Sequence, residues 1–104
     1  MSLSKRFLKS KPLCKVTFRL PAEAAPEAEQ VTIVGEFNDW SETATPMQKL
    51  KSGEFKLTID LETGREYQFR YLIDSETWEN DWEADKYVPT DAGDDNSVVD
   101  LAGE

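Results

Sequence analysis

Three tryptophans stand among polar and acidic residues in this sequence, at positions 40, 78 and 82. Trp40 follows Phe37-Asn38-Asp39, and the other two lie within residues 75–82, among Ser, Glu, Thr, Asn and Asp. A core tryptophan normally lies within an alternating apolar segment, and none of these three does. Aromatic side chains exposed on loops are typical of a binding surface. The alternative is that one or two of the indoles cap the ends of the fold.

The chemistry that such indoles favour is the recognition of sugars. A pyranose ring has an apolar face of C–H groups and a polar rim of hydroxyls, and a flat indole removes the apolar face from water at a small entropic cost. Planar polar side chains such as Arg and Asn can bond two neighbouring hydroxyl oxygens. Two tryptophans with an arginine and an asparagine nearby would therefore form a minimal platform for a carbohydrate.

Catalysis is disfavoured by the residue types that the chain contains. It has no histidine, which removes the commonest general base and metal ligand and excludes Ser-His and Cys-His nucleophiles. Carboxylate pairs could serve a glycosidase, but that reaction needs a deep cleft that so small a domain does not offer. The acidic residues within 91–96 do not match the spacing of a calcium loop. We therefore predict no enzyme activity, no catalytic residue, no metal and no cofactor.

The overall charge and composition narrow the choice of partner. The formal net charge of −9 over 104 residues disfavours nucleic acid and anionic membranes, whereas a neutral polysaccharide is not repelled. The acidic balance could equally serve solubility alone. No run of about 20 apolar residues is present, and no apolar stretch follows the basic N-terminus, so a cytoplasmic location is expected. The single cysteine, Cys14, precludes an internal disulfide.

The elements that must position these side chains are β-strands. Apolar and polar residues alternate with a period of two in several segments bounded by turn formers. The predicted strands are residues 13–20, 30–34, 47–50, 54–60, 66–74 and 97–101. About seven short strands and no strong helix predict an all-β, immunoglobulin-like β-sandwich in a single domain. Within 66–74, Arg70 is expected to point away from the face that Phe69 and Tyr71 share.

The N-terminal residues 1–11 are read as an arm, and residues 12–104 as the sandwich. Leu3, Phe7 and Leu8 have helical spacing, so one or two helical turns could dock on the body; a frayed, solvated terminus is the alternative. Cys14 lies on the apolar parity of its strand, which predicts a buried thiol.

Three segments resemble signatures of the family 48 carbohydrate-binding modules. Residues 31–40 end in Gly35-Glu36-Phe37-Asn38-Asp39-Trp40, which is similar to the family's Gly, one residue, Phe-Asn-Asn/Asp-Trp. Residues 69–74 followed by Trp78 resemble its second signature, and residues 93–98 its closing segment. The match covers nearly all of residues 11–101. The family includes the glycogen-binding domain of AMP-activated protein kinase β-subunits and the N-terminal domains of branching enzymes, isoamylases and pullulanases.

The resemblance implies an early-set immunoglobulin-like fold and a non-catalytic function. That function is the binding of α-1,4-glucan, such as glycogen, starch or a maltooligosaccharide. Trp40 and Trp78 would then be the stacking plates. Arg70 falls where the kinase-type modules carry a lysine that bonds sugar hydroxyls, and Asn96 falls on the sugar-contacting asparagine.

The chain also departs from the family pattern. The turn from Asp74 to Trp78 is one residue longer than usual and lacks glycine, which could displace or tilt Trp78. Ala92 replaces a leucine that projects into the glucan, and Trp82 has no counterpart. The alternative function is a regulatory or protein-interaction module, or an accessory domain of a glucan-active enzyme, that no longer binds sugar. Its partner would be a glucan-active enzyme or a kinase-like protein.

Overall fold

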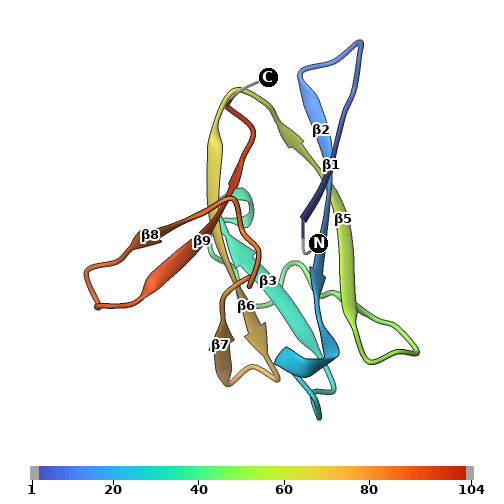
Figure 1. Ribbon diagram of the computed structural model, residues 1–104, viewed down its shortest axis with the longest axis vertical. Coiled ribbons are helices and arrows are strands. Elements are labelled where there is room, and N and C mark those ends of the chain that lie inside the picture. Colours follow the sequence, from blue (N-terminus) through green and yellow to red (C-terminus); the bar gives the residue numbers. More distant parts are fainter. Residues whose placement is uncertain (1–2, 103–104) are drawn as a thin grey trace.

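The computed structural model describes residues 3–102 as a sandwich of two antiparallel β-sheets (Figure 1). The first sheet has the strand order β1 (Leu3–Phe7), β2 (Leu13–Leu20), β5 (Phe55–Glu62) and β4 (Gln48–Lys49). The second has the order β3 (Val31–Gly35), β6 (Glu66–Ile73), β9 (Asp95–Asp100) and β8 (Lys86–Pro89), with β7 (Thr77–Glu79) also paired to β6. The prediction of an all-β, immunoglobulin-like sandwich is confirmed. Residues 3–102 contain nine strands where about seven were expected, and two short 3-10 turns, Ala22–Ala24 and Glu36–Asn38.

The core lies between the two sheets, and the alternation of the sequence explains how it forms. Four residues of β2 point inward and are fully buried: Cys14, Val16, Phe18 and Leu20. From the facing sheet, Phe69 meets Phe18 edge to face, with ring centroids 5.0 Å apart at 72°. Removing an aromatic side chain of this size from water stabilises the folded state by about 1.5–3 kcal/mol. The burial of Cys14 agrees with the sequence prediction.

The N-terminal segment is a β-strand, so the expectation of helical turns or a frayed end is wrong. Strand β1 pairs with β2 along its whole length, with Leu3 opposite Phe18 and Phe7 opposite Cys14. A spacing of four residues suits one face of a strand as well as one face of a helix, which is why the sequence misled. Met1 and Ser2 lie outside the described residues, and the division between arm and sandwich at residue 11 stays a prediction.

The acidic stretch after β6 also contains strands that the sequence pattern did not reveal. Strands β7 and β8 are three and four residues long, too short to show an alternation, and most of their residues are exposed. Strand β9 pairs with residues 66–69 of β6, and β7 pairs with residues 71–73. Trp78 therefore belongs to a strand and not to a loop.

Within residues 3–102, no helix has the length and apolarity needed to cross a membrane.

Candidate functional site

Residues 35–40 form a tight turn that leaves the core and ends at Trp40. Gly35 is required by a close approach, because a Cβ atom here would lie 2.6 Å from the backbone oxygen of Gln68 and 2.8 Å from the Cβ of Phe69. Phe37 turns back into the core, where its ring centroid lies 5.8 Å from that of Phe18. The turn is thus anchored by close packing of Gly35 on β6 and of Phe37 on the core.

Asn38 fixes the shape of this turn with its side chain. Its Oδ1 accepts the backbone N–H of Gly35 at 3.1 Å, and its Nδ2 donates to the carbonyl of Ile33 and to Oγ1 of Thr45, both at 3.0 Å. A single carboxamide therefore bonds two backbone groups of β3 and the hydroxyl of Thr45. An aspartate or alanine here could not supply the two donated bonds.

The same turn directs the indole of Trp40 to the surface. Asp39 and Trp40 adopt left-handed backbone conformations, with φ of 56° and 58°. The N–H of Trp40 donates to the carbonyl of Gly35 at 2.8 Å, which closes the turn. A left-handed tryptophan is strained, and such strain persists only where the surrounding structure imposes it. Trp40 is 40% exposed.

Strand register places Trp78 on the same face of the second sheet as Arg70. Phe69 and Tyr71 are fully buried in the core, so Arg70 and Leu72 point to the opposite, outer face, as the sequence parity predicts. Trp78 lies directly opposite Leu72 across the β6–β7 pair. Side chains of directly opposed residues lie on one face of a sheet. Trp78 is 43% exposed there.

The long turn before Trp78 contains no glycine and is held in place by hydrogen bonds to Asp74. Asp74 and Ser75 take left-handed conformations, with φ of 50° and 59°. Oδ1 of Asp74 accepts the backbone N–H groups of Glu29 and Gln30, both at 2.9 Å. Aspartate tolerates this conformation better than most residues do. The turn therefore leaves Trp78 in register with β6.

Arg70 and Asn96 form one hydrogen-bonded network on the outer face. The Nε of Arg70 donates to Oδ1 of Asn96 at 2.5 Å, and Nδ2 of Asn96 donates to Oε1 of Gln68 at 3.0 Å. The guanidinium also donates to both carboxylate oxygens of Asp94, from Nη1 at 3.2 Å and from Nη2 at 2.8 Å. Thr90 adds a bond from its hydroxyl to Asp94 at 2.6 Å.

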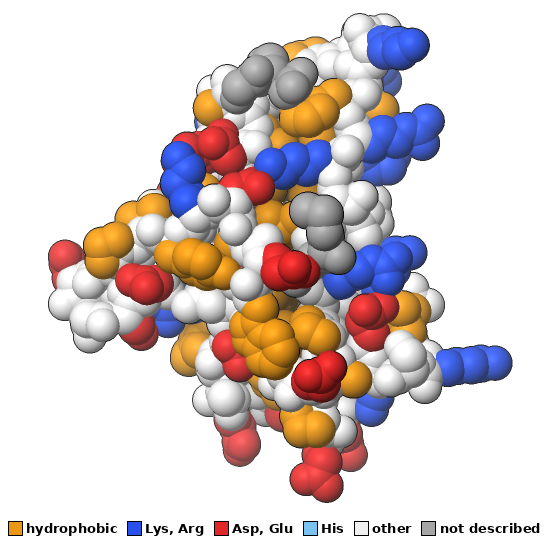
Figure 2. All heavy atoms as spheres, in the orientation of Figure 1, with side chains coloured by type: hydrophobic (Ala, Val, Ile, Leu, Met, Phe, Trp, Pro, Cys, Tyr) orange, Lys and Arg blue, Asp and Glu red, His pale blue; other side chains and the backbone are white. Residues whose placement is uncertain are grey.

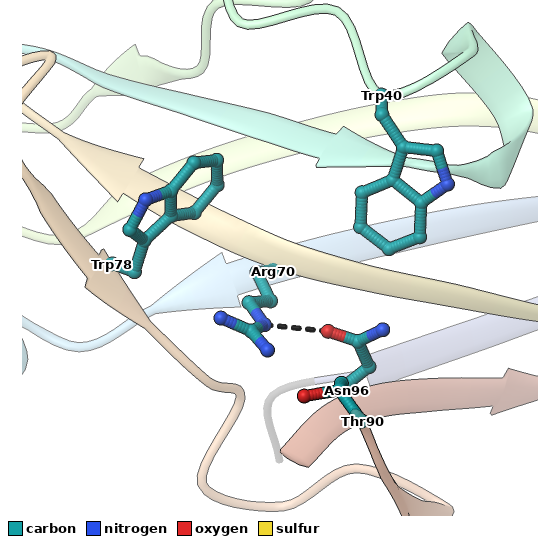
Figure 3. Close-up of a pocket in the computed structure, with 5 residues that line it drawn as sticks. All are labelled: Trp40, Arg70, Trp78, Thr90 and Asn96. Carbon is teal, nitrogen blue, oxygen red and sulfur yellow. Dashed lines mark hydrogen bonds between the residues drawn. The ribbon is translucent and has the colours of Figure 1, made fainter. Parts of the chain in front are cut away.

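These side chains surround an open groove of about 360 Å³, lined by Trp40, Arg70, Trp78, Thr90 and Asn96. Figure 3 shows the two indoles on either side of the Arg70–Asn96 hydrogen bond. The structure thus brings together all four side chains that the sequence analysis selected. Sequence reasoning missed Thr90, whose only signal was its place in the turn-rich loop before Asn96.

Two residues at which the chain departs from the family pattern, Trp82 and Ala92, do not line the groove. Trp82 is 51% exposed and is not one of the residues that line the groove. Ala92 is exposed, and its backbone N–H donates to the hydroxyl of Thr90 at 3.3 Å, so it lies at the tip of the loop that carries Thr90.

A buried polar network on the core side of the second sheet was also missed by sequence reasoning. The hydroxyl of Tyr71 donates to Oδ2 of Asp81 at 2.6 Å, and Asp81 is only 1% exposed. The backbone N–H of Asp81 donates to Oγ of Ser97, which in turn donates to Oδ1 of Asn80. The network fastens the chain after β7 to β6 and β9, so it supports the strand that carries Trp78.

These contacts shift the pKa values of Tyr71 and Asp94. Burial raises the pKa of Tyr71 well above its usual 10.0, and the neighbouring charge of Asp81 raises it further. The hydrogen bonds from Arg70 and then Thr90 lower the pKa of Asp94 below its usual 3.8. Among residues 3–102, no group of three or more His, Cys, Asp or Glu side chains is placed to hold a metal ion.

A two-sheet sandwich with an open aromatic groove on one outer face is typical of a binding module. The sequence pattern of one family, described as Carbohydrate-binding module 48 (Isoamylase N-terminal domain), matches residues 13–88. The chain belongs to this family, which confirms the resemblance noted from the sequence. The family consists of carbohydrate-binding modules and not of catalytic domains.

A curated relative supports the same grouping. The chain is 48% identical over 46 residues to a protein from Photobacterium profundum that is named 1,4-alpha-glucan branching enzyme GlgB. The aligned segment is 43% of this chain and 6% of that enzyme. The likeness therefore concerns a small part of the larger protein.

Proposed function

We propose that this protein binds α-1,4-glucan, such as glycogen, starch or a maltooligosaccharide, in the groove on the outer face of the second sheet. The observation that carries the proposal is the arrangement of two half-exposed indoles around one arginine–asparagine pair. Family membership supports carbohydrate as the class of ligand. The likeness to a protein named as a glucan branching enzyme supports glucan within that class.

The two indoles would supply most of the affinity. Each ring covers the apolar face of a glucose unit, and an aromatic plate loses little conformational entropy on binding. The groove is open, so few groups of the ligand are engaged at once. We expect a dissociation constant of about micromolar to millimolar.

The floor of the groove retains donors for hydroxyl oxygens. Arg70 has five N–H groups and uses three of them, one toward Asn96 and two toward Asp94, which leaves two. Nδ2 of Asn96 uses one N–H on Gln68 and keeps the other. Because their partners fix both side chains, these free donors are oriented before a sugar arrives.

The test is isothermal titration of the purified protein with maltoheptaose, on the wild type and three tryptophan variants. Trp40→Ala and Trp78→Ala should each weaken binding by about fivefold to thirtyfold, equivalent to about 1–2 kcal/mol of lost apolar contact. Trp82→Ala is the matched control, because Trp82 is exposed and does not line the groove. Absence of heat at millimolar sugar, or an equal loss in all three variants, would refute the proposal.

A second candidate function is that of an accessory domain of a glucan-active enzyme that no longer binds sugar. The likeness to part of a branching enzyme favours it. Co-purification from a lysate with and without added glycogen distinguishes the two, since a protein contact persists without the polysaccharide. A kinase-like partner, the exclusion of nucleic acid and membranes, and the cytoplasmic location stay predictions.

A further inference from the structure

The guanidinium of Arg70 does not face the groove as a free positive charge. Asp94 holds it through two parallel hydrogen bonds, and Thr90 holds the carboxylate of Asp94 in turn. The side chain of Arg70 is only 16% exposed, whereas that of Asp94 is 56% exposed. A ligand in the groove therefore meets an arginine whose charge is already neutralised at the surface.

We propose that Asp94 is a specificity-determining residue, which makes this groove select neutral glucan over glucan that carries phosphate esters. The inference rests on the proposed function and deepens it. A paired Arg70 still offers two N–H donors to uncharged hydroxyls. It has no surplus positive charge for a phosphate, which an unpaired arginine would bind in a bidentate manner.

The surroundings of Arg70 strengthen the discrimination. A second hollow of about 160 Å³ adjoins the groove and shares Arg70 and Trp78 with it. Its other lining residues are Glu79, Asn80, Asp94 and Asp95, so three acidic residues and one arginine line this hollow. On the face shown in Figure 2, Lys and Arg side chains gather mainly toward β1, β2 and β5, on the side of the first sheet. An anionic ligand would therefore meet net repulsion at Arg70.

The experiment compares two sugars and one anion on a small set of variants. Maltoheptaose and maltoheptaose carrying one 6-phosphate are titrated against the wild type, Asp94→Asn and Asp94→Glu. Asp91→Asn is the matched control, because it makes the same change in net charge in the same loop at a residue that lines neither hollow. The double variant Arg70→Gln/Asp94→Asn tests whether the effect passes through Arg70. Inorganic phosphate is titrated separately, with the indole N–H signal of Trp78 as the NMR readout.

The wild type, Asp94→Glu and Asp91→Asn should bind the phosphorylated sugar more weakly than the neutral one. Asp94→Asn should raise affinity for the phosphorylated sugar by about fivefold, the order expected from one exposed charge, and the gain should shrink at high salt. The double variant should show no gain. A merely structural role of Asp94 would weaken both sugars equally and would not produce a salt-dependent gain.

Failure of this inference is distinct from failure of the proposed function. If the wild type binds neither sugar, the glucan proposal fails, and the role of Asp94 is read from inorganic phosphate alone. Asp94→Asn must then show a phosphate-dependent shift that the wild type and Asp91→Asn lack. The inference is overturned if folded Asp94→Asn keeps the wild-type preference for the neutral sugar and does not respond to phosphate. It is also overturned if Asp91→Asn gains as much affinity for the phosphorylated sugar as Asp94→Asn does.

Discussion

Oδ1 of Asn38 accepts the backbone N–H of Gly35 at 3.1 Å, across the turn that carries Trp40. The bond joins the last residue of β3 to the middle of the turn. The N–H of Trp40 donates to the carbonyl of the same glycine, Gly35, at 2.8 Å. The position of one wall of the groove therefore depends on two residues that do not line it.

Replacing Asn38 by alanine should loosen Trp40 and destabilise the fold. The variant leaves the N–H of Gly35 and the carbonyl of Ile33 without their side-chain partner. We expect a loss of about 1–3 kcal/mol in the free energy of unfolding, measured by urea denaturation, and weaker binding of maltoheptaose. Asp39→Gly is the control, since glycine accepts the left-handed φ of 56°. Unchanged stability in Asn38→Ala would contradict the clamping role.

Gly35→Ala should be more harmful than a glycine replacement elsewhere. The new Cβ would meet two atoms of β6 that cannot move aside, Gln68 O at 2.6 Å and Phe69 Cβ at 2.8 Å. Overpacking of this kind costs about 1–3 kcal/mol. Gly64→Ala is the comparison, because its Cβ meets nothing within 4 Å and only its positive φ of 86° opposes the change. Equal thermal shifts in the two variants would argue against close packing at Gly35.

Tyr71→Phe should remove part of the loss of stability at alkaline pH. The pKa of Tyr71 is raised in the folded protein, so the protonated side chain stabilises the fold fully below about pH 10. This stabilisation is lost as the pH rises through the folded-state pKa. The phenylalanine variant should lose about 1–3 kcal/mol at neutral pH, because Asp81 loses a donor. Tyr87→Phe is the control, as its hydroxyl bonds the backbone of Asp81 at a less buried site. Identical alkaline unfolding profiles for Tyr71→Phe and the wild type would refute the assignment.

The carboxyl group of Asp94 should titrate below 3.8 in the folded protein. Its hydrogen bonds with Arg70 and Thr90 lower its pKa, so the contact stabilises the fold above pH 3.8 and is lost as the pH falls through the folded-state value. An NMR titration of the side-chain carboxyl carbon measures the midpoint. Arg70→Gln should move that midpoint upward. A midpoint at or above 3.8 in the wild type would mean that the pair is not formed in solution.

Affinity for neutral glucan should be almost independent of salt. An uncharged ligand needs no ion pair, and Arg70 is already paired within the protein. We expect less than about a twofold change in the dissociation constant of maltoheptaose when the Debye length shortens from about 10 Å to about 3 Å. Titrations at about 0.1 M and 1 M sodium chloride measure it. A loss of tenfold or more would indicate recognition through net charge.

The sequence by itself determined the fold class, most strand positions and the family. Alternation along residues 13–20 and 66–71 defines which side chains enter the core, because successive residues of a strand point to opposite faces. The segment from Gly35 to Trp40 is likewise readable, since its turn is built from contacts among close neighbours in sequence. Local patterns pointed to the tryptophans as exposed aromatic residues and to the outward direction of Arg70. The resemblance to the family assigned the binding roles of Trp40, Arg70, Trp78 and Asn96.

Only the tertiary structure decided how the candidates meet. The placement of Trp78 opposite Leu72 follows from the β6–β7 register, and the pairing of Arg70 with Asp94 joins residues that are 24 positions apart. The bond from Asn96 to Gln68 likewise joins residues that are 28 positions apart. Pairing between distant segments is set by packing of the whole sandwich, so no local pattern in the sequence could encode it.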